Sequence, residues 1–266
     1  PISHSRSPLI HGHWLERYGI DGAYIPFAVE PKNGAAAFRA LPKLGFSGTN
    51  VTLPHKLTAF QTVDVRDAAA EAIGAVNTVV VQSDGSLHGS NTDAPGLLAH
   101  LQASAPDWDA SVTPVMVLGA GGATRAAIFA LLQAGAPEIR LSNRTRAKAE
   151  VLADAFGEKV KVIDWSERSS ALAGCGLLVN TTSLGMTGQP ALDIVLEDLP
   201  GTAVVYDIVY SPLETPLLAA ARARGNQSVD GLGMLLHQAT PGFEAWFGVK
   251  PVVDATLRDV ILADLT

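Results

Sequence analysis

The sequence predicts an α/β protein of two units, the second of which is a doubly wound parallel sheet. Strand-like and helix-like runs alternate along almost the whole chain. A glycine cluster separates an apolar run from a helix-forming run within residues 115–133. A stretch rich in Pro, Ser and Asp, residues 103–114, marks the entry to the second unit. We expect a cleft between the units, with a cofactor on one side and a substrate on the other.

The first unit is predicted to mix helices with short strands. Strands at 78–82 and 86–89 are joined by the polar turn 83–85, which is typical of a hairpin. Asp93 fits the N-cap of the next helix, with Pro95 just inside it. The other expected elements are helices at 9–18, 34–41, within 57–73 and from 93 to 101, and strands at 24–29 and 48–52.

The second unit has the pattern of a parallel sheet, because helical segments separate most of its strands and crossovers between parallel strands are normally right-handed. After this sheet, residues 234–247 are amphipathic and predict one helix, and residues 254–265 predict a further one. The strands are expected at 115–118, 138–142, 160–164, 177–180 and 203–208.

Composition narrows the class of protein: the 266 residues are 47% hydrophobic and 17% charged, which is enough apolar material for a core. The net charge of −7 argues against nucleic acid or an anionic membrane as partner, and no apolar run reaches the ~18 residues of a membrane helix.

The single cysteine, Cys175, is expected in the core and fits a reducing compartment, so we expect a cytoplasmic protein. The chain lacks an initiating Met and begins inside a motif, so we expect the natural protein to have residues before Pro1.

A glycine turn follows the apolar run at 115–118. It contains Gly119, Gly121 and Gly122 and leads directly into a helix-forming run. Strand, glycine turn and helix is the Rossmann-like layout that places a pyrophosphate on a helix N-terminus. Thr124 stands where a third glycine is usual, so the alternative of an ordinary glycine-rich turn stays open.

The next strand predicts the phosphate form of a dinucleotide. It ends in Asn143, Arg144 and Thr145, and not in the acidic residue that would hold an NAD ribose. With Lys148 close behind, this basic tip suits a 2′-phosphate, so the predicted cofactor is NADP(H); the alternative is the solvated start of a helix. The residues expected to bind the cofactor are Gly119, Ala120, Gly121, Gly122, Ala123, Asn143, Arg144, Thr145, Lys148, Thr181 and Gly231.

Four polar clusters in the first unit are candidates for a second site. They lie at 1–8, 50–56, 74–78 and 89–93, each at the end of a strand or the start of a helix. Ligands of open α/β sheets bind outside the carboxyl ends of the strands. We therefore expect the four clusters to converge on one small, hydroxyl-rich ligand.

These motifs carry a family resemblance that runs from Pro1 to about Phe247. The segments PISHSRSP, NVTLPHK, GAVNT, GSNTDAPG, GAGGATRA, NRT and DGLGMLLHQA, in this order, closely resemble the shikimate dehydrogenase family. The glycine motif alone is common, whereas NVTxPxK together with GxNTD is highly specific. The resemblance implies reversible, NADP-linked reduction of 3-dehydroshikimate to shikimate, a step of chorismate and aromatic amino acid biosynthesis.

The resemblance also implies roles for single residues. Lys56 and Asp93 match the catalytic pair. It further implies a substrate-binding and catalytic unit of residues 1–93 with 233–266, and an NADP-binding unit of residues 94–232. The residues implied to bind the substrate are Ser5 and Ser7 at its carboxylate, Thr52, Asn77 and Gln238 at its hydroxyls and carboxylate, and Tyr210 nearby.

Two departures from the family pattern are visible. Gly12 follows His11 where the family often has Asn, and the glycine-bearing strand that usually precedes the first motif would lie before Pro1.

Three histidines, His4, His11 and His13, lie close together, but His11 and His13 are only two positions apart in a predicted helix and point to different faces. We therefore expect no metal site.

The pair is also consistent with elementary carbonyl chemistry. Hydride transfer to a carbonyl carbon leaves negative charge on oxygen, which must be stabilised and protonated. A cofactor carries the hydride, so no protein nucleophile or metal is required. Lys56 would lie by the developing alkoxide, and Asp93 would orient Lys56 and bind the neighbouring hydroxyl. The sequence leaves open which group delivers the proton.

Other functions stay open from the sequence. A relative with relaxed use of quinate or NAD is the first alternative, and a non-catalytic NADP-binding regulator is the second. Enzymes linked to folate with a similar layout also use a lysine, but the paired serines and the GSNTD cluster do not suggest them. The expected partner is the small-molecule substrate, shikimate or 3-dehydroshikimate, bound by a monomer or homodimer.

Overall fold

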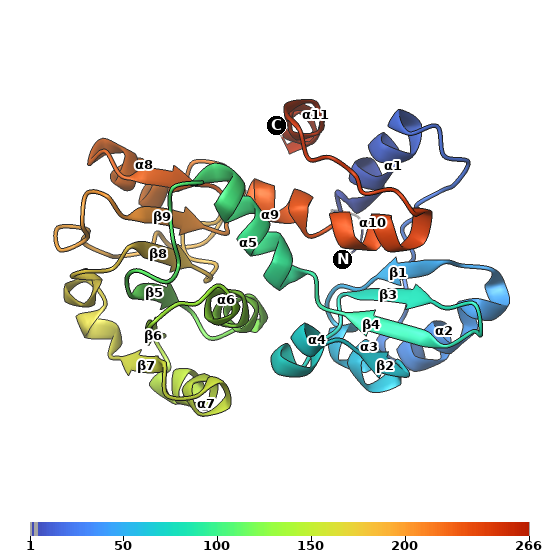
Figure 1. The fold of residues 1–266 in the computed structure, drawn as a ribbon, viewed down its shortest axis with the longest axis horizontal. Helices are drawn as coiled ribbons and strands as arrows, with labels where there is room; N and C mark the ends of the chain where they lie inside the picture. Colours follow the sequence, from blue (N-terminus) through green and yellow to red (C-terminus); the bar gives the residue numbers. More distant parts are fainter. Residues whose placement is uncertain (1, 3–4, 266) are drawn as a thin grey trace. The chain divides into compact units, whose positions relative to one another are not determined.

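The computed structural model describes residue 2 and residues 5–265 of the chain. These fall into two compact units (Figure 1). Unit 1 comprises the described residues up to Gly96 together with those from Leu235 onward, and unit 2 is Leu97–Met234. The chain passes between the units within α5 (Asp93–Ser104) and α9 (Leu232–His237).

Unit 1 is built on a four-stranded mixed sheet of order β1-β3-β4-β2. β1 (Gly48–Asn50) and β4 (Leu87–Ser90) each pair antiparallel with β3 (Thr78–Val81), whereas the short β2 (Val65–Arg66) pairs parallel with β4. The helices of this unit are α1 (Ser7–Arg17), α2 (Gly34–Ala40), α3 (Lys56–Thr62), α4 (Ala68–Ile73), α10 (Thr240–Phe247) and α11 (Ala255–Leu265), with 3-10 turns at Pro31–Asn33 and Pro42–Leu44.

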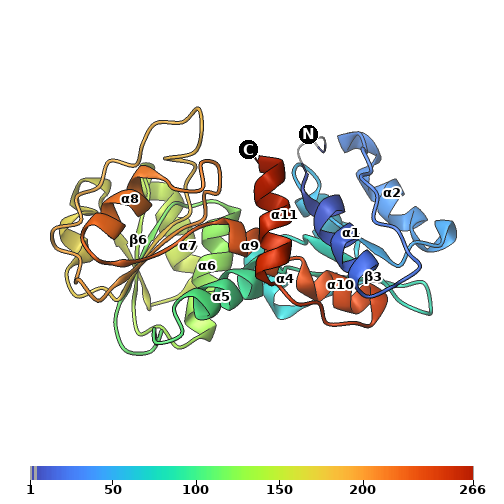
Figure 2. The ribbon, with the colours of Figure 1, turned by 90° about the horizontal axis from the view of Figure 1, so that it is seen from above.

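Helices cover both faces of this small sheet (Figures 1 and 2). On one face, Phe38 of α2 and Ala59 of α3 pack in a buried cluster with Val79 and Leu87 of the sheet. On the other face lies α10, whose Trp246 indole N–H donates to the Val79 carbonyl at 3.0 Å. The predicted hairpin is confirmed, because β3 and β4 are antiparallel neighbours joined by a tight turn.

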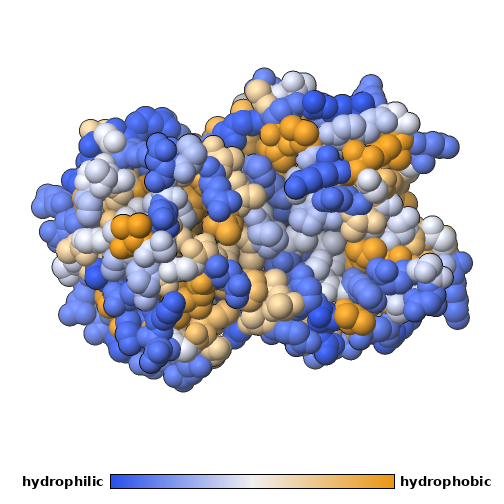
Figure 3. Space-filling view, in the orientation of Figure 1, coloured by the Kyte–Doolittle hydropathy of each residue, from blue (hydrophilic) through white to orange (hydrophobic). Residues whose placement is uncertain are grey.

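The strand predicted at residues 24–29 is wrong. This segment has no regular secondary structure, and its Ile25 and Phe27 side chains are 53% and 61% exposed. A strand requires ladder hydrogen bonds as well as a fitting sequence, and β1, at the edge of the sheet, pairs only with β3 among the described residues. Figure 3 shows such exposed apolar side chains as separate patches on a mostly hydrophilic surface.

The single helix predicted at 234–247 is also wrong. The structure has two helices here, α9 ending at His237 and α10 beginning at Thr240. Pro241 lies in the first turn of α10, where its missing N–H is tolerated, but it would interrupt a continuous helix. Two strands were not predicted, β2 and β10 (Gln227–Val229), since each is too short to show alternation.

Unit 2 contains a six-stranded sheet of order β10-β9-β8-β5-β6-β7 in which every pairing is parallel. All five strands predicted for this sheet are present. They are β5 (Val115–Leu118), β6 (Ile139–Ser142), β7 (Val160–Ile163), β8 (Leu177–Asn180) and β9 (Val204–Asp207), and the helical elements are α6 (Gly122–Gln133), α7 (Arg146–Phe156), α8 (Pro216–Ala223) and 3-10 turns at Trp165–Glu167 and Ser170–Leu172.

The sheet of unit 2 is buried on both faces. Figure 2 shows α6 and α7 on one side of the strands and α8 on the other. Met116, Leu178 and Val205 project into a core cluster with Leu217 of α8 and the lone Cys175. Cys175 is therefore a core residue, as predicted, and burial raises the pKa of its thiol. Two-sided cover explains why β5 is apolar throughout and why β8 and β9 are apolar up to their last residue.

Parallel register brings the ends of the central strands to one edge of the sheet. Leu118 of β5 lies beside Ser142 of β6, which in turn lies beside Ile163 of β7. On the other side Leu118 lies beside Asn180 of β8. The residues that follow these four positions therefore leave the sheet together, outside its carboxyl edge.

His11 of α1 is fully buried in an aromatic cluster of unit 1. Its ring stacks on Tyr24 with the ring centres 4.1 Å apart, and Trp14 and Phe243 lie against it. Burial lowers the pKa of His11 from its ordinary 6.5 to about 4, because the imidazolium would lose its hydration. His11 is thus a neutral core residue at neutral pH.

Acidification is expected to destabilise unit 1 through His11. The unfolded chain binds the proton near pH 6.5, whereas the folded unit binds it only near pH 4. The free energy of unfolding therefore decreases as the pH is lowered from 6.5 to 4. At pH 5 this amounts to roughly 2 kcal/mol relative to pH 7. Urea titrations of wild type and His11→Phe at both pH values measure it as the difference between the two proteins. His88→Phe, at an exposed position, is the control; an equal pH dependence in wild type and His11→Phe would contradict the prediction.

Candidate active site

Lys56 and Asp93 form an ion pair in unit 1. A turn in which the His55 N–H donates to the Thr52 carbonyl at 2.9 Å leads into α3, so Lys56 is the first residue of that helix. Lys56 Nζ lies 2.8 Å from Asp93 Oδ2, and the two side chains are 27% and 20% exposed. Asp93 is the first residue of α5, and its carboxylate pairs with Lys56 in place of the predicted N-cap role.

Asn77 fixes the second oxygen of Asp93. The Asn77 Oδ1 accepts from the Thr92 N–H at 2.9 Å and from the Thr78 hydroxyl at 3.0 Å. With its oxygen engaged in this way, Asn77 directs its amide nitrogen to Asp93 Oδ1 at 2.9 Å. Asn91 Oδ1 accepts from the Asp93 N–H at 3.1 Å and so supports the start of α5. The motifs GAVNT and GSNTD therefore meet around one carboxylate.

A second group of hydroxyls joins this network from the N-terminal side. The Tyr24 hydroxyl donates to Asn50 Oδ1 at 2.8 Å and is hydrogen-bonded by the Ser7 side chain. Asn50 in turn donates to the Thr78 hydroxyl at 3.1 Å, which links Tyr24 to Asn77. Burial raises the pKa of Tyr24 to about 12, so the phenol keeps its proton. Ser5 Oγ accepts from the Ser7 N–H at 3.3 Å.

Tyr24 and Asn50 were not predicted as site residues. Asn50 opens the NVTLPHK segment, so the motif itself contained the signal. Tyr24 lies in the segment expected to form a strand, where an aromatic residue indicates packing and not a hydrogen bond.

The remaining predicted substrate residues fall in different places. Thr52 is exposed and follows Val51, whose N–H donates to the Asn77 carbonyl at 2.7 Å. Gln238 follows α9, and a Cβ added to Gly96 of α5 would stand 2.7 Å from the Gln238 Cα. Tyr210 belongs to unit 2, in the segment after β9, and is 36% exposed. Within unit 1 the structure thus groups Ser7, Asn77, Lys56 and Asp93, with Thr52 and Gln238 beside them in the fold, while Tyr210 stays a prediction.

The glycine turn of unit 2 is held by two hydroxyl groups. Thr124 Oγ1 accepts from the Gly121 N–H at 3.0 Å and lies 2.7 Å from Thr181 Oγ1, which donates to the Leu118 carbonyl at 2.6 Å. Gly119 has φ +124°, and a Cβ there would stand 2.6 Å from Thr181 Oγ1. Thr124 therefore replaces the usual third glycine without loss of the tight turn, and α6 starts directly after Gly121.

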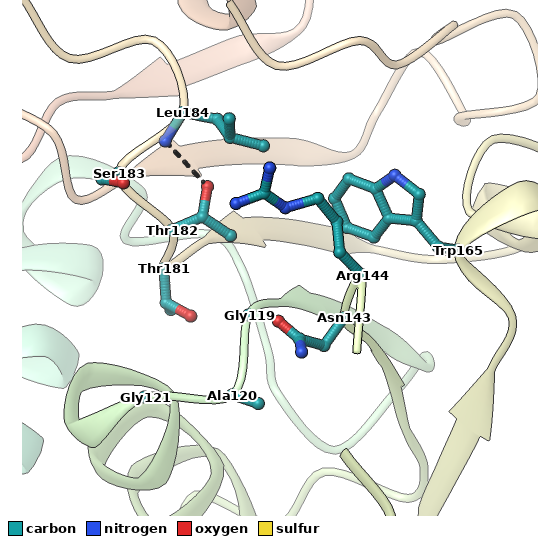
Figure 4. Close-up of a pocket in the computed structure, with 10 residues that line it drawn as sticks. All are labelled: Gly119, Ala120, Gly121, Asn143, Arg144, Trp165, Thr181, Thr182, Ser183 and Leu184. Carbon is teal, nitrogen blue, oxygen red and sulfur yellow. Dashed lines mark hydrogen bonds between the residues drawn. The ribbon is translucent and has the colours of Figure 1, made fainter. Parts of the chain in front are cut away.

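A pocket of about 240 Å³ lies at this edge of the parallel sheet (Figure 4). Six predicted cofactor residues line it, and four lining residues were not predicted, although they follow β7 and β8 at the same edge. The predicted ones are Gly119, Ala120, Gly121, Asn143, Arg144 and Thr181; the others are Trp165, Thr182, Ser183 and Leu184. The Leu184 N–H donates to the Thr182 hydroxyl at 3.0 Å, which fixes the loop after β8.

The pocket fits a dinucleotide. Where a Cβ would stand on Gly121 or Gly122, no heavy atom lies within 4 Å, so the backbone at the start of α6 is open to a pyrophosphate. Gly122 and Ala123 form the first turn of α6, while Thr145 and Lys148 lie at the start of α7.

Gly231 is not among the residues that line this pocket. Its Cβ position is 2.0 Å from the Ile208 carbonyl oxygen, so the backbone here packs against the end of β9. Its predicted contact with the cofactor remains a prediction.

Some of the basic residues near the pocket are held in ion pairs, and others are not. Arg140 is paired with Glu138 at 2.8 Å, and Arg146 with Glu150 at 2.8 Å. Arg146 also reaches Asp164 at 2.5 Å. Within residues 5–265, Arg144 and Lys148 form no ion pair, and both are exposed. Arg144 and Lys148 are thus the two cations near the pocket that are available to a phosphate.

Other kinds of site are not found in the part of the chain that the structure describes. No group of three His, Cys, Asp or Glu side chains in that part is placed to hold a metal ion. Its helices are also too short or too polar to cross a membrane.

Fold and site together define a class of protein: a dinucleotide-dependent oxidoreductase with a Rossmann-like unit and a separate unit that carries a Lys–Asp pair. Three family models match the chain. They describe a shikimate dehydrogenase substrate binding domain at residues 1–79, a shikimate/quinate 5-dehydrogenase at 101–187 and a shikimate 5′-dehydrogenase C-terminal domain at 231–258. The chain belongs to the shikimate dehydrogenase family.

Individual relatives agree with this membership. The shikimate dehydrogenase (NADP(+)) of Paramagnetospirillum magneticum is 58% identical over 99% of this chain and 95% of its own length. The solved shikimate 5-dehydrogenase of Thermus thermophilus, in complex with NADP(H) and shikimate, is 35% identical with a TM-score of 0.86, covering 100% of this chain and 97% of its own. The quinate dehydrogenase of Corynebacterium glutamicum, in complex with NAD, is 30% identical with a TM-score of 0.90, covering 99% and 96%.

Proposed function

We propose that this chain catalyses the reversible, NADP(H)-dependent reduction of 3-dehydroshikimate to shikimate. The observation that carries the proposal is the Lys56–Asp93 pair at 2.8 Å, with Asn77 on the free oxygen of Asp93. The names of the relatives, among them shikimate dehydrogenases of the NADP(+) type at 50–58% identity, support the substrate and the cofactor.

The substrate is proposed to bind to unit 1 by hydrogen bonds from neutral groups. Ser5 and Ser7 at the start of α1 would hold its carboxylate, and Tyr24 and Asn50 extend this hydroxyl and amide surface toward Asn77. Asn77, Thr52 and Gln238 are proposed to bind the ring hydroxyls. Tyr210, a residue of unit 2, is also proposed to bind the substrate.

Lys56 is proposed to act at the reacting oxygen. One of its three N–H bonds points to Asp93, which leaves two for the substrate. When bound, NADP(H) supplies or accepts the hydride. Negative charge that develops on the substrate oxygen is stabilised by the ammonium group, and Asp93 holds that group in place and accepts a hydrogen bond from the neighbouring hydroxyl.

The cofactor is proposed to lie along the glycine turn of unit 2. Its pyrophosphate would bind at the start of α6, at Gly121, Gly122 and Ala123, and its 2′-phosphate at Arg144 and Lys148. Asn143, Thr145 and Thr181 are also proposed to contact the cofactor. Gly231 is proposed to do so on the basis of the sequence alone.

Removal of the Arg144 guanidinium is expected to reduce the preference for NADP over NAD. Arg144→Ala should weaken NADP binding by about 10- to 100-fold, the loss typical of a charge-assisted contact, and leave NAD binding unchanged. Titration of both cofactors against wild type, Arg144→Ala and Arg146→Ala measures this, since Arg146 is committed to Glu150 and Asp164. Equal losses for NADP and NAD would refute the assignment of Arg144 to the 2′-phosphate.

The reaction itself is tested by combining shikimate or quinate with NADP or NAD. Purified protein should reduce NADP fastest with shikimate, followed as absorbance of the reduced nicotinamide. Preferred turnover of quinate would overturn the substrate assignment, and an absence of turnover with every pair would favour a non-catalytic regulator.

We further propose that the enzyme works in the cytoplasm as a monomer or homodimer, without a nucleic-acid or membrane partner. A single buried thiol and a net charge of −7 support this setting. Light scattering of the purified protein would give its mass in solution.

A further inference from the structure

Trp165 is a lining residue of the cofactor pocket to which no role has been given. It follows β7, two strands from the glycine turn after β5 and one strand from Arg144 after β6. Figure 4 shows its indole at the rim of the pocket beside the Arg144 side chain. Trp165 is half-buried, since it also packs against the core cluster of unit 2.

The Trp165 ring is braced from within the protein. The Arg168 guanidinium lies over the ring, 4.7 Å from its centre. Arg168 is held in turn by Asp193, whose backbone carbonyl and carboxylate accept at 2.7 and 3.0 Å. It also donates to the Trp165 carbonyl at 2.5 Å, and its side chain is only 12% exposed. These three hydrogen bonds fix Arg168, and the fixed guanidinium in turn restrains the Trp165 ring, so that the ring loses little further freedom when a ligand binds.

The order of groups along the sheet edge matches the order of groups in the adenosine half of the cofactor. Adjacent strands are spaced by about 4.8 Å, so Trp165 lies roughly 10 Å along the sheet from the glycine turn. The pyrophosphate belongs at Gly119–Gly122, and the phosphorylated ribose at Asn143 and Arg144. In the cofactor, the purine follows the phosphorylated ribose. Along the sheet edge, Trp165 is the lining side chain that follows Arg144.

We propose that Trp165 is the platform on which the purine of the dinucleotide stacks, and that Arg168 and Asp193 position it. This inference rests on the cofactor site proposed above. An indole offers a large flat π-surface to a base, and loss of such a surface weakens binding by roughly 5- to 100-fold. Trp165 touches only the adenosine half, so the loss is the same for the intact dinucleotide and for that half alone.

The test uses adenosine 2′,5′-bisphosphate, which has the purine and the 2′-phosphate but no nicotinamide. Calorimetric titration of wild type, Trp165→Leu and Trp165→Phe should show roughly 5- to 100-fold weaker binding for leucine and a loss under about 3-fold for phenylalanine. NADP binding should fall by the same factors. Trp108→Leu is the matched control, because Trp108 is a half-buried tryptophan of the same unit that does not line the pocket.

Fluorescence gives a second readout that does not depend on the stability of Trp165→Leu. Stacking of the purine should quench indole emission in wild type, and this quenching should be lost in Trp165→Phe, which keeps an aromatic ring. Arg168→Leu should weaken the bisphosphate by about 2- to 5-fold through the loosened ring; unchanged binding would overturn the role of the brace.

The outcomes separate this inference from the proposed cofactor site. If Arg144→Ala weakens the bisphosphate but Trp165→Leu binds it as wild type does, the purine platform is refuted and the phosphate site stands. If neither variant changes binding, the cofactor site itself is refuted. If Trp165→Phe retains the quenching, the quenched tryptophan is a different one and the stacking assignment fails.

Discussion

Replacing Lys56 by methionine is expected to lower kcat for shikimate oxidation by about 10³-fold or more. Methionine keeps the length of the side chain and removes its charge and its donors. The ammonium group is the nearest cation to Asp93, at 2.8 Å, and no other lysine or arginine forms an ion pair with that carboxylate among the described residues. The variant would then lack the ammonium group that is proposed to stabilise charge on the reacting oxygen.

Affinity for NADP should be unchanged in Lys56→Met, because the residues that line the cofactor pocket all belong to unit 2. Steady-state kinetics with each substrate varied in turn separates the two effects. Lys43→Met is the control, since Lys43 is an exposed lysine of unit 1 that makes no ion pair in the described part of the chain. If Lys56→Met kept most of the wild-type kcat, Lys56 could not be the group that acts at the oxygen.

The parallel sheet of unit 2 was the most predictable part of the fold. Its central strands are buried on both faces, so each one is a short apolar run between polar turns. The parallel direction of neighbouring strands then follows from the alternation of strands and helices along the chain. The position of the glycine turn at the carboxyl edge, and six of the lining residues of the pocket, were therefore accessible from the sequence.

Unit 1 was harder to predict because its strands depend on their neighbours. Residues 24–29 have the composition of a strand, yet no strand of the described chain pairs with them. Strand propensity describes how a side chain fits a sheet and cannot supply the ladder. The break between α9 and α10 was readable in principle, since Pro241 stands within the run predicted as one helix.

Site residues outside a motif were missed for a related reason. Trp165 follows β7, but a tryptophan after a strand is more often part of the core, and here it is partly that. Tyr24 reaches Asn50 only through tertiary structure, because the two residues lie 26 positions apart in the sequence. In contrast, Lys56 and Asp93 were assigned through motifs, and the structure brings their side chains together across 37 positions.

Gly119→Ala is expected to weaken NADP binding by about 100-fold or more, the size of effect that a displacement near 1 Å produces at a positioned ligand. The Gly119 φ of +124° is a conformation that an alanine adopts only with strain, and the new methyl would stand 2.6 Å from Thr181 Oγ1 and 2.9 Å from Thr124 Oγ1. Those two hydroxyls hold the turn against Leu118 and Gly121. The turn must therefore shift, and the start of α6 shifts with it.

Two further glycines separate strain from loss of the binding surface. Gly121→Ala places a methyl where no heavy atom lies within 4 Å, so the protein should be as stable as wild type and yet bind NADP more weakly. Gly135→Ala introduces strain at φ +98° beyond the end of α6, outside the pocket, and should lower the melting temperature without changing NADP affinity. Calorimetric titration and thermal unfolding of the three variants give both quantities. Wild-type NADP affinity in Gly121→Ala would contradict the assignment of the pyrophosphate to this turn, because the added methyl would stand in open space at the position assigned to that group.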